Sequence, residues 1–345
     1  MDSKTIVGKS EEMCPEKEFK FRKKHNLIHV LEKTVDGQTD RRLCIKEFRR
    51  SAAGEKLADA DLLRSGSVLV KTAKYLVSQV AFSKNCAPTA VYEFVFDRLR
   101  SVRQDMVIQQ LPYTEKETAL EILCLCCRYY VYIDFNTKFN VEELKIDKHI
   151  HLTHLHDCLN SFVKLAFKES KLNDHLLEIV YSYLLLNLDS EQCLMNVLIN
   201  FPEILKRNNL LSSVVELCLL MIRKDNYFRI VLLYKSIYAR CSNFTKMLLC
   251  ISLAKVRTMF LGTLCTSHNS KTFNFPITVL QNWLFLSDSK STVQFCSKHG
   301  LSCTEVKVNL SKSKFNIEGM FYSTSCPVFK YLTSKDVCFN RMLSS

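Results

Sequence analysis

The stretch Tyr92-Glu-Phe-Val-Phe-Asp-Arg-Leu-Arg-Ser-Val-Arg-Gln-Asp-Met-Val-Ile-Gln109 decides the fold of this chain, because it carries three arginines beside one apolar stripe. At 100° per residue of an α-helix, four of its apolar residues fall on a single face. These residues are Val95, Leu99, Val102 and Met106. The spacing predicts a helix that packs this face against a core.

The polar residues of this helix have two interpretations. Long polar side chains beside an apolar stripe usually lay their stems over the core and direct their charged ends to carboxylates or helix ends. The alternative is a surface that binds nucleic acid or a protein partner. We expect Arg98 and Asp105 to fasten neighbouring helices, and Arg100 and Arg103 to face a ligand.

Composition points to an all-helical globular protein. The 345 residues are 47% hydrophobic, which is enough for one large or two medium cores. The chain has only 7 glycines and 6 prolines, and this scarcity disfavours turn-rich β architecture. We therefore expect long helices joined by short connections.

The 16 cysteines do not indicate a disulfide framework, because they are spread over a long chain and no signal peptide is recognisable at its start. A reducing compartment, either cytosol or nucleus, fits better. The longest apolar runs, such as Met247–Ala254, fall short of the roughly 20 residues that span a bilayer. We expect no transmembrane helix and no membrane partner.

The net charge of +13 attracts nucleic acid, acidic proteins or anionic membrane surfaces without choosing among them. The segment Lys271–Ser345 has nine Lys and Arg against four Asp and Glu, a net charge of +5. The cluster around Lys20–Lys24 is either a nuclear-localisation signal or a solvated helix face. Both regions are candidate basic surfaces.

Four parts are expected along the chain. Residues 1–12 are polar and predict a flexible leader. Residues 13–266 predict a stack of helix pairs, a helical-repeat α-solenoid of the TPR or PCI type, with short polar breaks between apolar-periodic segments. Residues 275–335 predict a separate module, and residues 336–345 a tail.

The module at 275–335 predicts a winged helix. Phe275–Leu286 and Ser289–His299 are periodic as helices, with Gly300 as the helix stop. Leu301–Leu310 alternates as one strand, and the basic loop Ser311–Lys314 precedes another apolar stretch. Winged helices bind nucleic acid through a helix or the basic wing, but in multisubunit scaffolds they also bind proteins.

Catalytic or metal chemistry has little support in the sequence. Cys14 precedes a helix start, but no base or oxyanion site is near it, so we expect a structural thiol. His149, His151, His154, His156 and Cys158 form a metal-like cluster, yet at most three could share a helix face, and the interleaved leucines indicate a core helix. Phosphate-binding glycine loops and hydrolase motifs are absent, and we expect neither enzymatic activity nor a cofactor.

Three linked segments of the chain resemble the homology domain of the GANP (germinal-centre-associated nuclear protein) family, also called the Sac-three family. They are Met13-Cys-Pro-Glu-Lys-Glu18, Ile45-Lys-Glu-Phe-Arg-Arg-Ser-Ala-Ala-Gly54, and Phe94–Asp105 with Gln109. Their order, separations and helical context agree with the family. A weaker similarity continues to about Leu332. The resemblance implies a helical stack capped by a winged helix.

The resemblance also implies a function. Large family members scaffold a nuclear-pore-associated complex that exports messenger RNA, and they pair with a PCI-domain winged-helix subunit and a small acidic protein. We therefore expect a scaffold that binds such partners and single-stranded RNA in the nucleus. The short animal members are instead associated with centrosome duplication and the mitotic spindle, which implies a protein-binding role without RNA in the cytoplasm or at the centrosome.

The resemblance and the charge pattern together select eight candidate contacts for nucleic acid or a partner. They are Lys46, Arg49, Arg50, Arg100, Arg103, Lys307, Lys312 and Lys314. The first five belong to the linked segments, and the last three to the expected wing.

Overall fold

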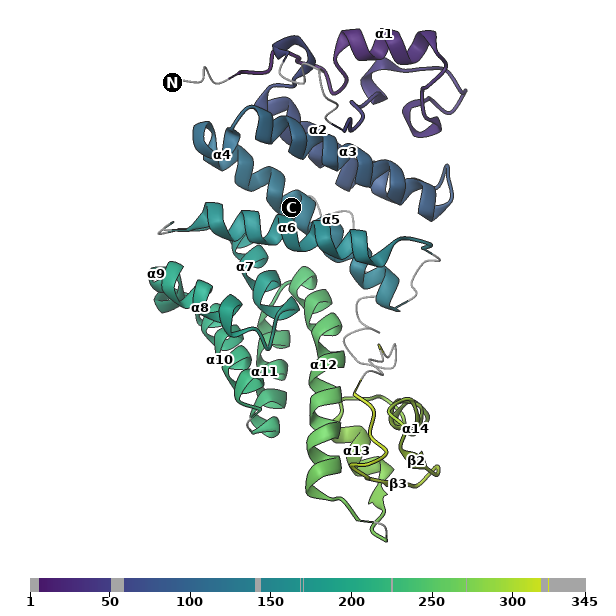
Figure 1. The fold of residues 1–345 in the computed structure, drawn as a ribbon, viewed down its shortest axis with the longest axis vertical. Helices are drawn as coiled ribbons and strands as arrows, with labels where there is room; N and C mark the ends of the chain where they lie inside the picture. Colours follow the sequence, from purple (N-terminus) through teal and green to yellow (C-terminus); the bar gives the residue numbers. More distant parts are fainter. Residues whose placement is uncertain are drawn as a thin grey trace. The chain divides into compact units, whose positions relative to one another are not determined.

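A computed structural model describes residues 6–50, 59–139, 144–167, 169, 171–224, 226–270, 272–317 and 322. The chain divides into two compact units, which we describe separately. Within the described residues, unit 1 runs to Phe167 and includes Asn173–Ile179, and unit 2 contains Val180 and the residues that follow it. The chain is mostly helical, as predicted (Figure 1).

In the described residues of unit 1 there are six helices and the first half of a seventh. They are α1 (Glu16–Lys24), α2 (Gly66–Ser78), α3 (Pro88–Ile108), α4 (Leu111–Thr114), α5 (Lys116–Phe139), α6 (Lys148–Ala166) and α7 (Asp174–Leu186). Four 3-10 turns, η1 to η4, lie at Val30–Glu32, Arg41–Leu43, Ala60–Leu62 and Val80–Phe82. Helices α5 and α6 lie side by side, and α5 is buried along most of its length (Figure 1).

Helix α3 is the helix that the opening stretch predicts. It begins at Pro88, a residue favoured in the first helical turn because its missing N–H has no partner there anyway. The predicted stripe is buried, with Val95, Leu99 and Val102 at 0% exposure. Arg98 and Asp105 are buried beside it. This confirms that the stripe faces a core.

The predicted flexible leader is wrong for residues 8–10. The amide of Gly8 donates to Gln109 Oε1 at 2.7 Å, and the amide of Ser10 donates to the Leu63 carbonyl at 2.9 Å. A Cβ on Gly8 would lie 2.5 Å from the Arg64 carbonyl oxygen, so the segment passes very close to the backbone that it contacts. Polar sequence without periodicity gave no sign of these bonds, since they form with residues more than 50 positions away.

Unit 2 contains the second half of α7 and five further helices before its sheet. They are α8 (Glu191–Asn200), α9 (Pro202–Arg207), α10 (Asn209–Arg223), α11 (Tyr227–Arg240) and α12 (Asn243–Ser267). Side chains cap four of their N-termini: Ser190, Asn208, Asn226 and Ser242 each accept from a backbone N–H of the first turn. The short connections match the polar breaks in the sequence.

The C-terminal part of unit 2 contains a small antiparallel sheet and two helices. The elements are β1 (Phe275–Pro276), α13 (Ile277–Trp283), α14 (Ser289–Lys298), β2 (Ser302–Cys303) and β3 (Lys307–Asn309). The strand order is β1-β3-β2, with Val308 opposite both Phe275 and Cys303. Gly300 follows α14 with φ +80°, and a Cβ there would lie 2.4 Å from the Lys314 carbonyl oxygen.

Two details of this part differ from the prediction. The single strand expected at Leu301–Leu310 is a hairpin, because the Thr304 hydroxyl and backbone bond to Lys307 and fold the chain back. Phe275 and Pro276 form a strand instead of the first turn of a helix. Ser311–Lys314 is a turn after β3, and the second strand predicted beyond it lies largely outside the described residues, as do the tail at 336–345 and most of 318–335.

The sheet and the last helices share one core with α12, so packing continues across the boundary predicted at residue 266. Leu261, Leu264 and Cys265 of α12 are buried together with Ile277, Leu280 and Phe295 in one hydrophobic cluster. Helix α12 is long and apolar enough to cross a membrane. An 18-residue window of this helix has a mean hydropathy of 1.6, but 78% of the window is buried inside the protein. Such burial is typical of a helix in the core of a protein, which can be as long and as apolar as a membrane-spanning helix.

Candidate nucleic-acid interface

The segment Cys44–Arg50 contacts both α1 and α3 in unit 1, and side chains of its neighbours satisfy its backbone groups. The amides of Ile45, Glu47 and Phe48 donate to Glu32, Glu18 and Asp97, while the carbonyls of Ile45 and Arg49 accept from Arg22 and Gln104. The three segments that resemble a family homology domain therefore meet here. Their charged residues hold an extended segment in place without a sheet.

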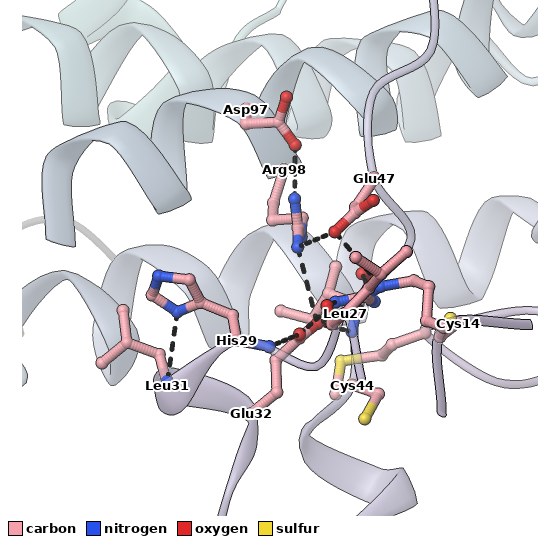
Figure 2. Close-up of polar contacts among 12 residues, drawn as sticks. Cys14, Leu27, His29, Leu31, Glu32, Cys44, Glu47, Asp97 and Arg98 are labelled. Carbon is pink, nitrogen blue, oxygen red and sulfur yellow. Dashed lines mark hydrogen bonds and ion pairs between the residues drawn. The ribbon is translucent and has the colours of Figure 1, made fainter. Parts of the chain in front are cut away.

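Glu32 lies at the centre of this contact (Figure 2). The Arg22 guanidinium binds the Glu32 carboxylate with two nitrogens, and both side chains are almost completely buried. The carboxylate also accepts from the amides of Ile45 at 2.9 Å and His29 at 3.0 Å. A buried charge is tolerated only when it is paired and hydrogen-bonded, and Glu32 meets both conditions.

Arg98 links α3 to the same centre. Its Nη2 donates to Glu47 Oε1 at 3.0 Å and lies 3.7 Å from Glu32, while Nη1 binds Asp97. The guanidinium lies 4.5 Å above the Phe94 ring. Figure 2 shows Arg98 reaching Asp97 on one side and Glu47 on the other. Three carboxylates thus surround two buried arginines.

Asp105, seven residues after Arg98 on α3, forms a second buried centre. It binds Lys46 Nζ at 2.6 Å and Arg64 Nε at 2.8 Å. Arg64 also donates to the Ser101 hydroxyl at 2.9 Å. Arg98 and Asp105 therefore fasten α3 to other parts of the fold, but their partners lie in a 3-10 turn and in non-helical segments, not on the neighbouring helices that the sequence predicts.

Lys46 does not fit the predicted role of a ligand contact. Its ammonium already has Asp105 and the Leu62 carbonyl as partners, and the residue is only 8% exposed. Burial lowers the pKa of Lys46, and the Asp105 charge opposes this shift. We therefore leave Lys46 out of the candidate interface.

Burial also sets the chemistry of the acids and thiols in this region. It raises the pKa of the Cys14 thiol to about 12, so the thiol stays protonated at neutral pH. The pKa of Glu18 is raised by burial as well, against the hydrogen bond from the Glu47 amide and the charge of Arg49. Cys14 is therefore a packed side chain, as the sequence predicts.

Three of the predicted cations remain at the surface of this contact. Arg49 and Arg50 are exposed, and the only acid near Arg49 among the described residues is Glu18, at 3.9 Å. Arg100 is half-buried, with its guanidinium 3.8 Å above the Phe48 ring. A guanidinium stacked on an aromatic ring can keep its N–H groups pointing outward, in its own plane above the ring. We define Arg49, Arg50 and Arg100 as the arginine surface.

Arg103 lies elsewhere, half-buried between α3 and α6. Its Nη1 is 3.3 Å from His154 Nδ1. His151 lies on α6, as His154 does, and is buried. Its Nε2 is 3.0 Å from the Tyr130 carbonyl oxygen, and its Nδ1 is 3.3 Å from the Tyr92 hydroxyl. Among the residues that the structure describes, no group of three or more His, Cys, Asp or Glu is placed to hold a metal ion.

The three predicted lysines of the wing are exposed in unit 2. Lys307 begins β3 opposite Pro276, and Lys312 and Lys314 lie in the turn after this strand. The Lys314 ammonium donates to the Ser302 hydroxyl at 3.3 Å. Each unit therefore carries its own basic surface.

The sequence reasoning missed the carboxylates that neutralise the arginines. Glu32, Glu47 and Asp97 were not selected, although Glu32 shows a local signal: it is the third residue after His29 in a capping box. That signal predicts a helical turn but says nothing of Arg22 or Arg98. Only the fold brings these charges together.

Comparison with known proteins adds independent information. Residues 13–305 match the sequence model of the SAC3/GANP family. The chain is 34% identical over 131 residues to SAC3 family protein 1 of Schizosaccharomyces pombe, which covers 35% of this chain and 12% of that protein. It is 33% identical over 119 residues to SAC3 family protein B of Arabidopsis thaliana, and 26% identical over 156 residues to Protein xmas of Drosophila melanogaster.

These last two alignments cover 34% and 40% of this chain, and 7% of each of the two relatives. The fold and the buried charge network define a mostly helical protein in which charged side chains hold a non-helical segment on a helix. The family match spans most of the sequence, and the chain belongs to the SAC3/GANP family. It spans about a tenth of the length of the curated relatives that it matches, or less.

Proposed function

We propose that this chain is a non-enzymatic scaffold that binds a partner subunit and single-stranded RNA in nuclear processing or export of messenger RNA. Membership of the SAC3/GANP family supports the scaffold role. The observation that carries the RNA part is the arginine surface, where Arg49, Arg50 and Arg100 stay solvent-accessible beside a network that neutralises the other arginines. Solvent-accessible guanidinium groups suit phosphate, which they can bind with two N–H groups.

We further propose that the sheet and helices after residue 275 form a winged helix, with the β2–β3 hairpin as the wing. Two helices followed by an antiparallel hairpin support this assignment. In this proposal the module pairs with the winged helix of a PCI-domain subunit, and a small acidic protein completes the complex. Copurification of the tagged full chain with mass spectrometry tests both partners, and recovery of neither would contradict this part.

RNA binding is tested by fluorescence anisotropy of a labelled 20-nucleotide RNA at several salt concentrations. For single strands the logarithmic salt slope changes by about 0.7 for each phosphate contact. Replacing Arg49 and Arg50 by alanine should therefore weaken binding and make the slope shallower by about 1.4. The matched control is Arg42→Ala, an exposed arginine whose charge is already paired with Asp40 at 3.0 Å.

Two outcomes would contradict the proposal. If the chain bound no RNA at low salt, with and without the copurified partner, the nucleic-acid part would be wrong. If the tagged protein lay at the centrosome and spindle and not in the nucleus, the export role would give way to a protein-binding role in cell division. Microscopy in interphase and mitosis distinguishes these locations.

A further inference from the structure

A series of aromatic rings crosses the surface of unit 2, outside the arginine surface. Consecutive ring centroids lie 5.3 Å apart for Phe228 and Trp283, 5.3 Å for Trp283 and Phe275, 6.3 Å for Phe275 and Phe273, and 6.1 Å for Phe273 and His268. We call these five residues the aromatic track. They come from α11, α13, β1 and the segment after α12, so only the fold assembles them.

The two ends of the track are exposed to solvent. Phe228 is 51% exposed and Phe273 is 46% exposed, and His268 beside it is also exposed. Trp283 is half-buried, and Phe275 is buried at 7% exposure as the link between them. What distinguishes these exposed phenylalanines is that they belong to one series of neighbouring rings, and covering one such ring with a ligand contributes roughly 1.5–3 kcal/mol.

Hydrogen bonds to backbone carbonyls and ring stacking hold two of the rings in place. The Tyr227 hydroxyl donates to the Trp283 carbonyl at 2.7 Å, and its ring stacks on Phe260. At the other end, the Asn309 amide donates to the Phe273 carbonyl at 3.2 Å. A ligand that used these rings would therefore meet a surface that is already ordered, which lowers the entropy cost of binding.

Cations flank both ends of the track. Lys224 is exposed in the turn before α11, four residues before Phe228 in the sequence. Lys235 places its ammonium 5.0 Å above the ring of Phe285, which follows Trp283 by two residues. Lys307 is opposite Pro276, next to Phe275, and the Lys312 amide donates to the side chain of Asn269, next to His268. Within the described part of the chain, Lys224, Lys307 and Lys312 have no carboxylate partner.

We propose that the aromatic track is a stacking site for single-stranded RNA, with bases on Phe228 and on the Phe273–His268 pair and phosphates on the flanking lysines. Rings with exposed faces between cations are the combination that binds single strands without sequence preference. A protein partner would use the apolar area of Phe228 and its neighbour Leu232 and would not need the lysines. The inference rests on the proposed function for its ligand class, and it adds a site that the arginine surface does not include.

The test measures binding of the full chain to a fluorescein-labelled 15-nucleotide oligouridine. Stacking of one base contributes roughly 1–3 kcal/mol, so Phe228→Ala should raise the Kd about 5- to 150-fold. The matched control is Phe21→Ala, which removes an equally exposed ring, also 51%, from unit 1 and should leave the Kd unchanged. Trp283 is the only tryptophan, so quenching of its emission by RNA reports contact with the track.

A second variant separates stacking from apolar docking. Phe228→Leu keeps most of the apolar area but removes the ring, and it should weaken RNA binding nearly as much as alanine does, whereas Phe228→Tyr should restore it. If leucine retained full affinity, the track would be a protein-docking surface and the inference would be wrong. If RNA binding depended on Arg49 and Arg50 but not on Phe228, and RNA did not quench Trp283 emission, the inference would fail while the proposed function stood. Absence of all RNA binding would contradict both the inference and the RNA part of the proposed function.

Discussion

Removing the Glu32 carboxylate should destabilise unit 1 more than removal of any surface charge. In Glu32→Ala, the Arg22 guanidinium, at 0% exposure, loses its main counter-ion, and the amides of Ile45 and His29 lose their acceptor. Deleting one member of a buried ion pair costs about 3–5 kcal/mol, because the other charge stays buried without that counter-ion; Arg22 would retain Glu47, whose carboxylate lies 3.1 Å from its Nε. A whole domain is stable by only about 5–15 kcal/mol, so this variant is expected to unfold unit 1 at mild denaturant concentrations.

Two further variants define the size of the effect. Glu32→Gln keeps an oxygen that can accept from the Ile45 amide, so its cost should be smaller, about 1.5–3 kcal/mol for the lost charged hydrogen bonds. The control is Lys20→Ala, which breaks an exposed i,i+4 pair with Glu16 and should cost about 0.5 kcal/mol or less. The order alanine, glutamine, control is the prediction.

The assay is urea unfolding of the full chain, followed by far-ultraviolet circular dichroism and by tryptophan emission. Circular dichroism reports the helices of both units, whereas Trp283 lies in unit 2 alone. The circular dichroism midpoint should fall strongly in Glu32→Ala, with the earliest loss of helix preceding the change in Trp283 emission. If Glu32→Ala lowered the free energy of unfolding by less than about 1 kcal/mol, the reasoning would be refuted, because the Arg22 guanidinium would then have to remain hydrated in the folded protein.

Three further predictions follow from other parts of unit 1. Burial lowers the pKa of His151 below its ordinary value of 6.5, so the folded state binds fewer protons than the unfolded state. The free energy of unfolding should therefore fall as the pH drops below about 6.5. Urea midpoints at pH 7.5 and 5.5 check this, and His151→Gln should reduce the difference between them. Gly8→Ala should cost about 1–3 kcal/mol, because the new methyl group would contact the Arg64 carbonyl, while Val7→Ala, at a 67% exposed position, should change stability by less than about 0.5 kcal/mol in the same urea assay. Cys14, whose pKa is raised to about 12 by burial, should stay unmodified by a thiol reagent at pH 8 until the protein unfolds, and mass spectrometry of the labelled peptides would expose the opposite result.

The helices could be predicted from the sequence because their signals are local. The stripe through Val95 and Met106 repeats within one helix, and the stop at Gly300 depends on the neighbouring backbone alone. The strand at Leu301–Leu310 was predicted wrongly for a related reason. Alternation of apolar residues continues through a tight hairpin, so the pattern alone could not show that the Thr304 side chain closes a turn there.

The polar contacts could not be predicted, since each joins residues far apart in the chain. Lys46 and Asp105 are 59 positions apart, and Gly8 and Gln109 are 101 positions apart. Periodicity gives the face of a helix on which a charge lies, but not the charge that another element brings to it. For this reason the sequence predicts that Arg98 fastens the helix but does not name its partner, and it places Lys46 on a surface although Lys46 is buried.

The distinction between structural and available cations therefore depends on the counter-ions. In unit 1, Arg22, Arg64 and Arg98 have carboxylates at hydrogen-bond distance and lie beneath the surface, whereas Arg100 rests on the Phe48 ring and Arg50 is exposed. A net charge of +13 consequently overstates the field of the buried motifs and understates that of the remaining surfaces, because neutralised pairs contribute little at a distance. Arg49, Arg50 and Arg100 lie where the buried network ends, and their solvent-accessible guanidinium groups are the physical reason to look for phosphate on the arginine surface instead of inside the motifs that identify the family.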